Sequence, residues 1–232
     1  MNYNLEMPYD VKYIIDVLYE NGYEGYMVGG CVRDLILGKK PNDYDITTNA
    51  EPYIVASLFK KVILTGLKHG TVTVVINNNQ YEVTTYRIDG DYEDSRHPKN
   101  VLFVNDITKD LSRRDFTINA MAYNDKKGLV DCFGGICDLN NRIIRTVGNP
   151  SNRFEEDALR MLRAIRFAIQ LEFKIEETVL EAITVLKKNI GNISKERIRE
   201  EFKKAMGNFK AQFNISDDDS SNDNESVDSG TV

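Results

Sequence analysis

Asp43 and Asp45 are the residues whose spacing points most directly to chemistry. They lie in Asp43-Tyr44-Asp45-Ile46, whose alternation of polar and apolar residues predicts a strand. Residues i and i+2 of a strand face the same side, about 6.5–7 Å apart, so both carboxylates would project together. Such a pair favours a cation, and oxygen ligands suit Mg²⁺ bound jointly with substrate phosphates. The spacing is common on its own, and two surface acids in a solvated turn are the alternative.

A phosphate-binding turn is predicted just upstream of these acids. Gly29 and Gly30 stand between a short apolar strand, residues 26–28, and a helix over 31–38. Glycine lets backbone N–H groups approach a phosphate closely, and a helix N-terminus favours an anion. Arg33 in the first helical turn could clamp a phosphate with two hydrogen bonds. An ordinary strand–helix turn is the alternative, but GG-x-x-R-D-x-x-x-G followed by D-x-D is far more specific than two glycines.

Glu82 would add a third carboxylate. The runs 71–76 and 80–87 predict two strands, and the three asparagines between them, 77–79, predict a hairpin turn. Glu82 and Thr84 share one face of the second strand. The pattern alone favours an ordinary surface residue, so the assignment of Glu82 to the metal site depends on further context.

The elements that must position these residues divide the chain into three parts. The head, residues 1–148, mixes helices and strands, which predicts an α+β fold. The neck, residues 149–210, reads as helical from Arg153 onward. The tail, residues 211–232, has six acids and no Lys or Arg, and its composition predicts disorder. Further expectations are a helix over 8–22, a mobile polar loop over 89–100, a helix or a strand over 116–122, and Ser194 as a helix N-cap.

Composition narrows the classes of function. The net charge is −6, but the tail accounts for all of it, and residues 151–210 hold 13 Lys/Arg against 10 Asp/Glu. A locally basic region of this kind can hold an RNA backbone with salt-sensitive affinity. No apolar run approaches a membrane span and the first residues do not resemble a secretory signal, so we expect a cytoplasmic protein without a membrane partner. The scattered Cys31, Cys132 and Cys137 predict buried free thiols, not disulfides or a zinc site.

Taken together, GGCVRDLILGKKPNDYDITT resembles the signature of the nucleotidyltransferase superfamily in its bacterial class II branch, the tRNA nucleotidyltransferases (CCA-adding enzymes) and poly(A) polymerases. Further blocks follow in the family's order between about residues 24 and 206. They are KHGTVTVV with YEVTTYR, DYEDSRHPKNVLFV, DLSRRDFTINAMAYN, DCFGGICDLNNRIIRTVG, RFEEDALRMLRAIRFA and ISKERIREEFKKAM. The resemblance implies a nucleotidyltransferase head with a small mixed β-sheet flanked by helices, followed by a helical neck that recognises the nucleotide base.

The resemblance also assigns roles. Asp43 and Asp45 would hold Mg²⁺, with Glu82 as the third catalytic carboxylate. The nucleotide would be bound by Gly29, Gly30, Arg33, Arg114, Asp115, Glu156, Asp157, Arg160, Arg163 and Arg166, of which Asp157 and Arg160 would read the edge of the base.

The spacing of the last group has its own physical reading. In one continuous helix Asp157, Arg160 and Arg163 would share a face. A carboxylate beside a guanidinium offers an acceptor and several donors to a base edge. A salt bridge between residues three apart on a solvated face is the alternative.

The implied enzyme is a template-independent RNA nucleotidyltransferase that adds C and/or A from CTP and ATP to the 3′ end of tRNA and releases pyrophosphate. CC-adding members of the family tend to lack much of the flexible loop, so the resemblance of the whole loop over 89–100 implies CCA or A addition. Family members usually extend much further, so the expected tRNA grip is missing from this chain, which would then be a truncated product or act with an RNA-binding partner subunit. The alternatives are an A-adding or poly(A)-adding enzyme on another RNA, a small-molecule nucleotidyltransferase, or a non-catalytic sensor.

Overall fold

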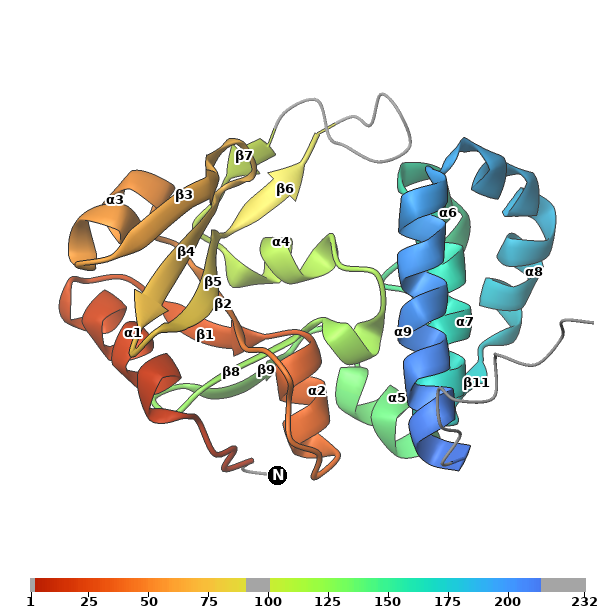
Figure 1. Ribbon diagram of the computed structural model, residues 1–232, viewed down its shortest axis with the longest axis horizontal. Coiled ribbons are helices and arrows are strands. Elements are labelled where there is room, and N and C mark those ends of the chain that lie inside the picture. The colour runs from red at the N-terminus through yellow and green to blue at the C-terminus, as the bar shows by residue number, and fades with distance from the viewer. Residues whose placement is uncertain (1–2, 91–100, 214–232) are drawn as a thin grey trace, which may run out of the picture.

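A computed structural model describes residues 3–90 and 101–213 (Figure 1). We call the part through β10 the head and the part from α6 the neck. The head contains α1 (Tyr9–Glu20), β1 (Gly25–Val28), α2 (Gly30–Ile36), β2 (Asp45–Thr48), α3 (Pro52–Leu58), β3 (Val62–Gly66), η1 (Leu67–His69), β4 (Thr71–Ile76), β5 (Asn79–Thr85), β6 (Arg87–Asp89), β7 (Val101–Phe103), α4 (Ile107–Ser112), η2 (Thr117–Asn119), β8 (Met121–Asn124), β9 (Gly128–Asp131), α5 (Gly135–Asn141) and β10 (Ile143–Ile144). The neck contains α6 (Pro150–Glu156), α7 (Leu159–Leu171), β11 (Lys174–Ile175), α8 (Glu177–Leu186), η3 (Lys187–Asn192) and α9 (Lys195–Phe213).

The head is built on a mixed seven-stranded sheet in the order β3-β4-β5-β2-β1-β8-β9. Its pairs are antiparallel except β2 and β5, which run parallel with Ile46 beside Val83. The predicted hairpin is confirmed: β4 pairs with β5, and Asn77 and Asn78 form its turn with φ of 50° and 66°. Positive φ at both turn residues matches the twist of the strands, and asparagine tolerates it better than most residues. The expected α+β class with a mixed sheet is therefore confirmed.

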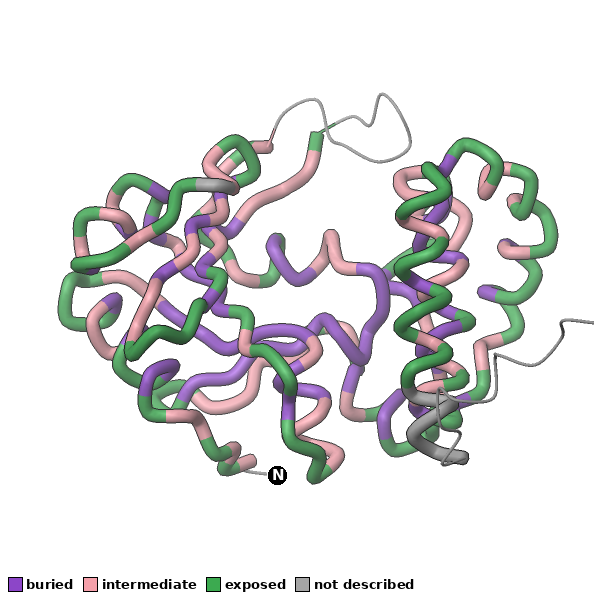
Figure 2. The backbone as a smooth tube through the Cα atoms, in the orientation of Figure 1, coloured by how far each residue is buried: buried purple, intermediate pink, exposed green. Residues whose placement is uncertain are grey.

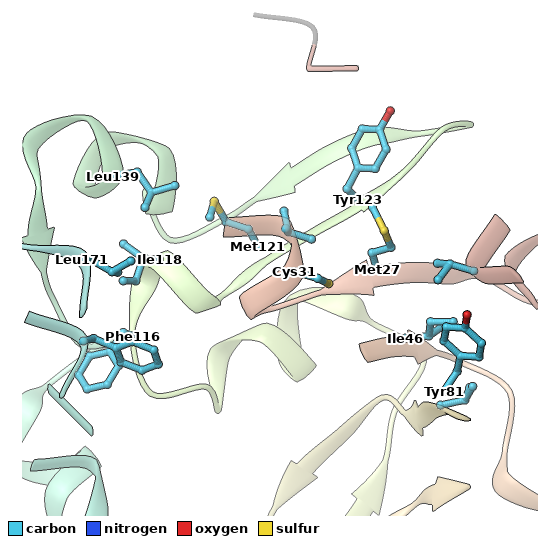
Figure 3. Packing of buried hydrophobic residues seen from close by; sticks show 14 of the residues in the cluster. Met27, Cys31, Ile46, Tyr81, Phe116, Ile118, Met121, Tyr123, Leu139 and Leu171 are labelled. Atoms are coloured by element: carbon cyan, nitrogen blue, oxygen red, sulfur yellow. The ribbon is translucent and has the colours of Figure 1, made fainter. Parts of the chain in front are cut away.

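One hydrophobic core joins head and neck. It includes Val11 of α1, Ile46 of β2 and Met161 of α7, all with no exposed side-chain surface. At the boundary the rings of Phe116 and Phe167 meet edge to face, with centroids 5.7 Å apart. Figure 2 shows buried segments in the central strands and in the helices that face them, and Figure 3 shows core side chains from both parts in one cluster.

The neck differs from the sequence expectation at one point. The helix expected to run on from Arg153 is interrupted, because Asp157 has extended backbone angles, φ −146° and ψ 105°. The Asp157 side chain accepts a hydrogen bond from the Leu159 N–H at 3.0 Å, which satisfies a free donor at the start of α7. The prediction that Asp157 and Arg160 lie on one face of a continuous helix is therefore wrong.

Several predicted boundaries shift. Strand β2 begins at Asp45, so Asp43 lies in the preceding loop, and the expected strand over 80–87 divides at Tyr86 into β5 and β6. Residues 116–122 form η2 and the start of β8, and α9 begins directly after Ser194. Of the loop expected over 89–100, residues 91–100 lie outside the described residues. Of the tail expected over 211–232, residues 211–213 belong to α9 and residues 214–232 lie outside the described residues.

Within residues 3–90 and 101–213, no helix is long and apolar enough to cross a membrane. All three cysteines are free, but only Cys31 is buried. The expectation of burial is wrong for Cys132 and Cys137, because both side chains lie at the surface of the head.

Candidate active site

A cleft of about 640 Å³ lies between the head and the neck. The head contributes the β1–α2 turn and the segment that leads into β2, and the neck contributes α7 and α9. Most of the predicted site residues line this cleft: Gly29, Gly30, Arg33, Asp43, Asp45, Arg114, Asp115, Arg163 and Arg166.

The carboxylates gather at the start of β2. The parallel register that sets Ile46 beside Val83 also sets Asp45 level with Glu82, and Asp43 lies two residues before Asp45. All three side chains reach solvent. Surrounding protein atoms nevertheless desolvate Asp45 and raise its pKa to about 6; the charges of Asp43 and Glu82 add to the rise, while Arg114 opposes it.

This crowding fits a divalent cation. Among the described residues, no three His, Cys, Asp or Glu side chains form a complete metal site by themselves. Mg²⁺, however, commonly takes only one or two carboxylates, with water and substrate phosphates as its other ligands. Asp43 and Asp45 offer two carboxylate ligands open to the cleft, and a cation would offset the charges of Asp43 and Glu82 that add to the effect of desolvation on the Asp45 pKa.

The β1–α2 turn is shaped by Gly29. Its backbone has φ 81° and ψ −129°, and its N–H donates to the Met121 carbonyl at 3.0 Å. A Cβ at this position would lie 2.9 Å from Nη1 of Arg114. Glycine therefore permits the guanidinium of Arg114 to lie against the turn, where it faces the carboxylates of Asp45 and Asp110.

Replacing Gly29 with Ala is expected to lower stability and impair the site together. These backbone angles are essentially restricted to glycine and cost about 1–3 kcal/mol in other residues. The new methyl group would also displace Arg114. Thermal unfolding measures the first effect, and titration with ATP, as the ligand that the sequence resemblance implies, measures the second. Gly38→Ala is the matched control, because Gly38 also has a positive φ, 69°, but nothing lies within 4 Å of its Cβ position. Equal loss of ATP affinity in both variants would contradict the role given to Arg114.

Three arginines form the cationic wall of the cleft around Phe167. The guanidinium carbons of Arg33, Arg163 and Arg166 lie 5.0, 5.4 and 4.0 Å from the ring centroid. The face of an aromatic ring attracts cations, which offsets part of their mutual repulsion. Arg33 comes from the head and is fixed by Asn119, whose Oδ1 accepts from its Nη1 at 2.8 Å.

Asp115, a head residue that lines the cleft, forms an ion pair with Arg163 of the neck. Its Oδ2 accepts from Nε of Arg163 at 2.7 Å, and its Oδ1 accepts from the Phe116 N–H at 2.8 Å. Burial alone would raise the pKa of Asp115, but the Arg163 guanidinium outweighs this effect and lowers it. Asp115 is therefore an ionised link between head and neck.

The three residues of the E-D-x-x-R motif lie away from this cleft. Arg160 is buried and donates to Glu156 at 2.6 Å and to the Arg113 carbonyl at 3.2 Å. Asp157 accepts from Arg197 of α9 at 2.8 Å. Glu156 lines a second cleft of about 520 Å³. The structure thus places neither Asp157 nor Arg160 on the main cleft, and Asp157 is paired with Arg197 rather than with Arg160.

Comparison with known proteins decides the family. The family model of the poly A polymerase head domain matches residues 25–145, which is more than half of the chain. The chain belongs to the poly(A) polymerase head-domain family. A second model, described as a probable RNA and SrmB binding site of polymerase A, matches residues 172–213 in the neck.

Individual members of the family are similar to this chain over about half of their own length. The CCA-adding enzyme of Oceanobacillus iheyensis is 53% identical over 191 residues, which cover 82% of this chain and 48% of that protein. The Bacillus stearothermophilus CCA-adding enzyme in complex with CTP superposes with a TM-score of 0.80 and 43% identity, covering 88% and 49% of the two chains. The Thermotoga maritima CCA-adding enzyme complexed with tRNA superposes with a TM-score of 0.69 and 29% identity. The match covers 88% of this chain and 50% of that one. The chain spans about half the length of the curated relatives it matches.

Sequence reasoning missed three residues that contact the predicted site residues: Asn119, Phe167 and Arg197. Asn119 and Arg197 act across 86 and 40 residues of sequence, on Arg33 and Asp157. Local spacing carries no signal for such pairs. Phe167 is a buried apolar residue, and nothing in the local sequence indicates that three arginines contact its ring.

Proposed function

We propose that this chain is the catalytic part of a metal-dependent RNA nucleotidyltransferase that adds C and/or A from CTP and ATP to the 3′ end of tRNA. The observation that carries the proposal is the gathering of Asp43, Asp45 and Glu82 beside a cleft with a cationic wall. Relatives support it: similar solved structures are CCA-adding enzymes in complex with CTP, ATP and tRNA. Because the chain spans about half of these proteins, the activity, substrates and partners of the whole protein all belong to this proposal.

In the proposed reaction the RNA 3′ oxygen forms a bond to the α-phosphorus of the nucleotide. The bond from that phosphorus to the bridging oxygen breaks, pyrophosphate leaves with the electron pair, and the hydroxyl proton passes to water. Asp43 and Asp45 would hold Mg²⁺, with Glu82 beside them; when bound, the metal lowers the pKa of the attacking hydroxyl and stabilises the leaving group.

The other predicted residues would bind and orient the nucleotide. Gly29 and Gly30 leave room for phosphates at the turn, and Arg33 and Arg114 supply positive charge there. The proposed domains follow: a head over 1–148 for catalysis and a neck over 149–210 for base recognition. The ribose and base would lie near Asp115, Glu156, Asp157, Arg160, Arg163 and Arg166, and base reading would require Asp157 and Arg160 to exchange their present partners for the base.

Labelled ATP and CTP incorporation tests the proposal. The purified chain is incubated with Mg²⁺ and tRNA transcripts that end before CCA, after C and after CC. Entry of CTP followed by ATP supports CCA addition, and entry of ATP alone supports an A-adding or poly(A)-adding enzyme. Repetition with the transcripts and an added C-terminal RNA-binding half from a relative tests for a missing partner. No incorporation in any combination would overturn the proposal. The proposed location is the cytoplasm, where exposed free thiols such as Cys132 and Cys137 stay reduced.

A further inference from the structure

The cleft carries more positive charge than its acids neutralise. Eight Lys and Arg side chains line it against four Asp side chains, although the whole chain has a net charge of −6. Four of the eight are the arginines described above, and each lies against an acid of the protein itself. These arginines are therefore largely committed to holding the site together.

The four lysines are different. Lys39 and Lys40 follow α2 on the head side of the cleft, and Lys203 and Lys204 lie on α9 on the neck side. Within the described ranges no ion pair involves Lys39, Lys40 or Lys203, and Lys204 approaches only Glu201 at 3.9 Å while 58% of its side chain is exposed. The uncommitted positive charge of the cleft thus lies in two exposed lysine pairs on opposite sides.

We propose that these two lysine pairs bind the backbone phosphates of the RNA acceptor strand next to its 3′ end. The inference rests on the proposed function and names a binding subsite for its macromolecular substrate. Lysine suits this role because its ammonium group contacts phosphates as a point charge, without the fixed geometry of arginine and without reading sequence.

The positions of the two lysine pairs favour an extended RNA strand over a compact triphosphate as their ligand. Lys39 and Lys40 lie only three to six residues before Asp43 and Asp45, so phosphates held there are close to the carboxylates. The two pairs belong to different parts of the molecule, and both line the same cleft. An extended ligand that passes between head and neck can contact both pairs, whereas the proposed triphosphate site at Gly29, Arg33 and Arg114 consists of less exposed residues.

Binding measurements on three double variants test the inference. Lys39→Ala/Lys40→Ala and Lys203→Ala/Lys204→Ala remove one pair each, and Lys60→Ala/Lys61→Ala is the matched control, an exposed adjacent pair on the head outside the cleft. The probe is a fluorescent tRNA transcript without its last three nucleotides, titrated across a range of salt. ATP with Mg²⁺ is titrated separately by calorimetry. Surface substitutions of this kind leave the fold intact.

Each cleft variant is expected to bind the RNA roughly tenfold more weakly at about 0.1 M salt, with a slope of log K against log salt reduced by about 1.4–2. The control should keep both values, and ATP affinity should change less than twofold in every variant. A fall in ATP affinity as large as the fall in RNA affinity would assign the lysines to the triphosphate and overturn the inference. Unchanged RNA binding, or an equal loss in the control, would also overturn it. If the unaltered chain binds no RNA, the inference fails, and the incorporation assay with the added RNA-binding half decides the proposed function separately. If the unaltered chain binds RNA and the cleft variants bind it equally well, only the inference fails.

Discussion

Asp45→Asn is expected to reduce nucleotide addition at least a hundredfold and, at the same time, to stabilise the fold at neutral pH. The loss of rate follows from removing a charge that holds the cation, since groups that stabilise developing charge are typically worth about 10²–10³ in rate. Asp43→Asn should lose activity to a similar degree. The gain in stability is specific to Asp45, because its carboxylate is crowded by desolvation and by the charges of Asp43 and Glu82.

The pH dependence of that gain follows from the raised pKa. In the folded chain the pKa of Asp45 is about 6, above its ordinary value of 3.8, so the folded state binds the proton more tightly than the unfolded state. Ionising Asp45 therefore costs stability as pH rises from about 4 to 6, and the full cost is present above 6. Asparagine removes this cost. Because the side chain reaches solvent, the gain is at most about 1 kcal/mol.

Thermal unfolding without divalent cations, at pH 4 and pH 7.5, measures the effect alongside kcat. Asp45→Asn should raise Tm at pH 7.5 and leave it nearly unchanged at pH 4. Glu181→Gln, an exposed change on α8, is the control and should alter neither Tm nor kcat. More than a tenth of kcat remaining in Asp45→Asn would contradict the catalytic assignment, and a lower Tm at pH 7.5 would contradict the crowding of the carboxylates.

Asp115→Asn is expected to destabilise the chain by about 2–3 kcal/mol, which corresponds to a fall in Tm of roughly 4–12 °C for a protein of this size. The change removes the carboxylate charge 2.6 Å from Arg163, at the junction of head and neck, and leaves only the more distant Glu201 carboxylate at 3.9 Å. The estimate is below the usual 3–5 kcal/mol for a broken buried pair because the Arg163 side chain is 31% exposed. Asp16→Asn is the control: its partner Lys126 is at 2.9 Å, but both side chains are about one third exposed, and it should cost less than about 1 kcal/mol.

A double-mutant cycle with Arg163→Ala isolates the pair, and the coupling should account for most of the loss. The pKa of Asp115 is lowered in the folded chain, so its contribution is present above the unfolded pKa and disappears as pH falls through the folded pKa. Unaltered protein should therefore lose more stability than Asp115→Asn on acidification below about pH 4. Parallel acid curves for the two proteins would rule out an ionised Asp115.

The parts of the site that follow from local sequence were predictable, and the parts that depend on distant residues were not. Two glycines before a helix carry their geometry within a few residues, and the structure places Gly29 on one cleft with Asp43 and Asp45. The strand predicted to hold both acids begins only at Asp45, so their shared strand face was not predicted correctly. Glu82 needed the hairpin as well, whose asparagine turn fixes the register of β5.

The backbone conformation of Asp157 could not be predicted from local sequence. Its neighbours have helical periodicity, yet its backbone is extended, because its carboxylate satisfies the Leu159 N–H and pairs with Arg197 of α9. A preference for helix along the segment cannot reveal that the Asp157 side chain caps the next helix at Leu159 and pairs with a residue 40 positions away. Strands β8 and β9 were likewise not anticipated as a pair, since they are short and the residues before β8 form a 3₁₀ turn.

The shared core of head and neck has a consequence for how this catalytic part can be divided. A fragment that ends before α6 would lose Phe154, Met161 and Phe167, and the surface they cover, including Phe116, would be left facing water. The head of this chain is thus not a self-contained module onto which any neck can be exchanged. A chimera with a relative's neck would keep its structure only if the side chains that meet Phe116 and Asp115 were transferred along with it.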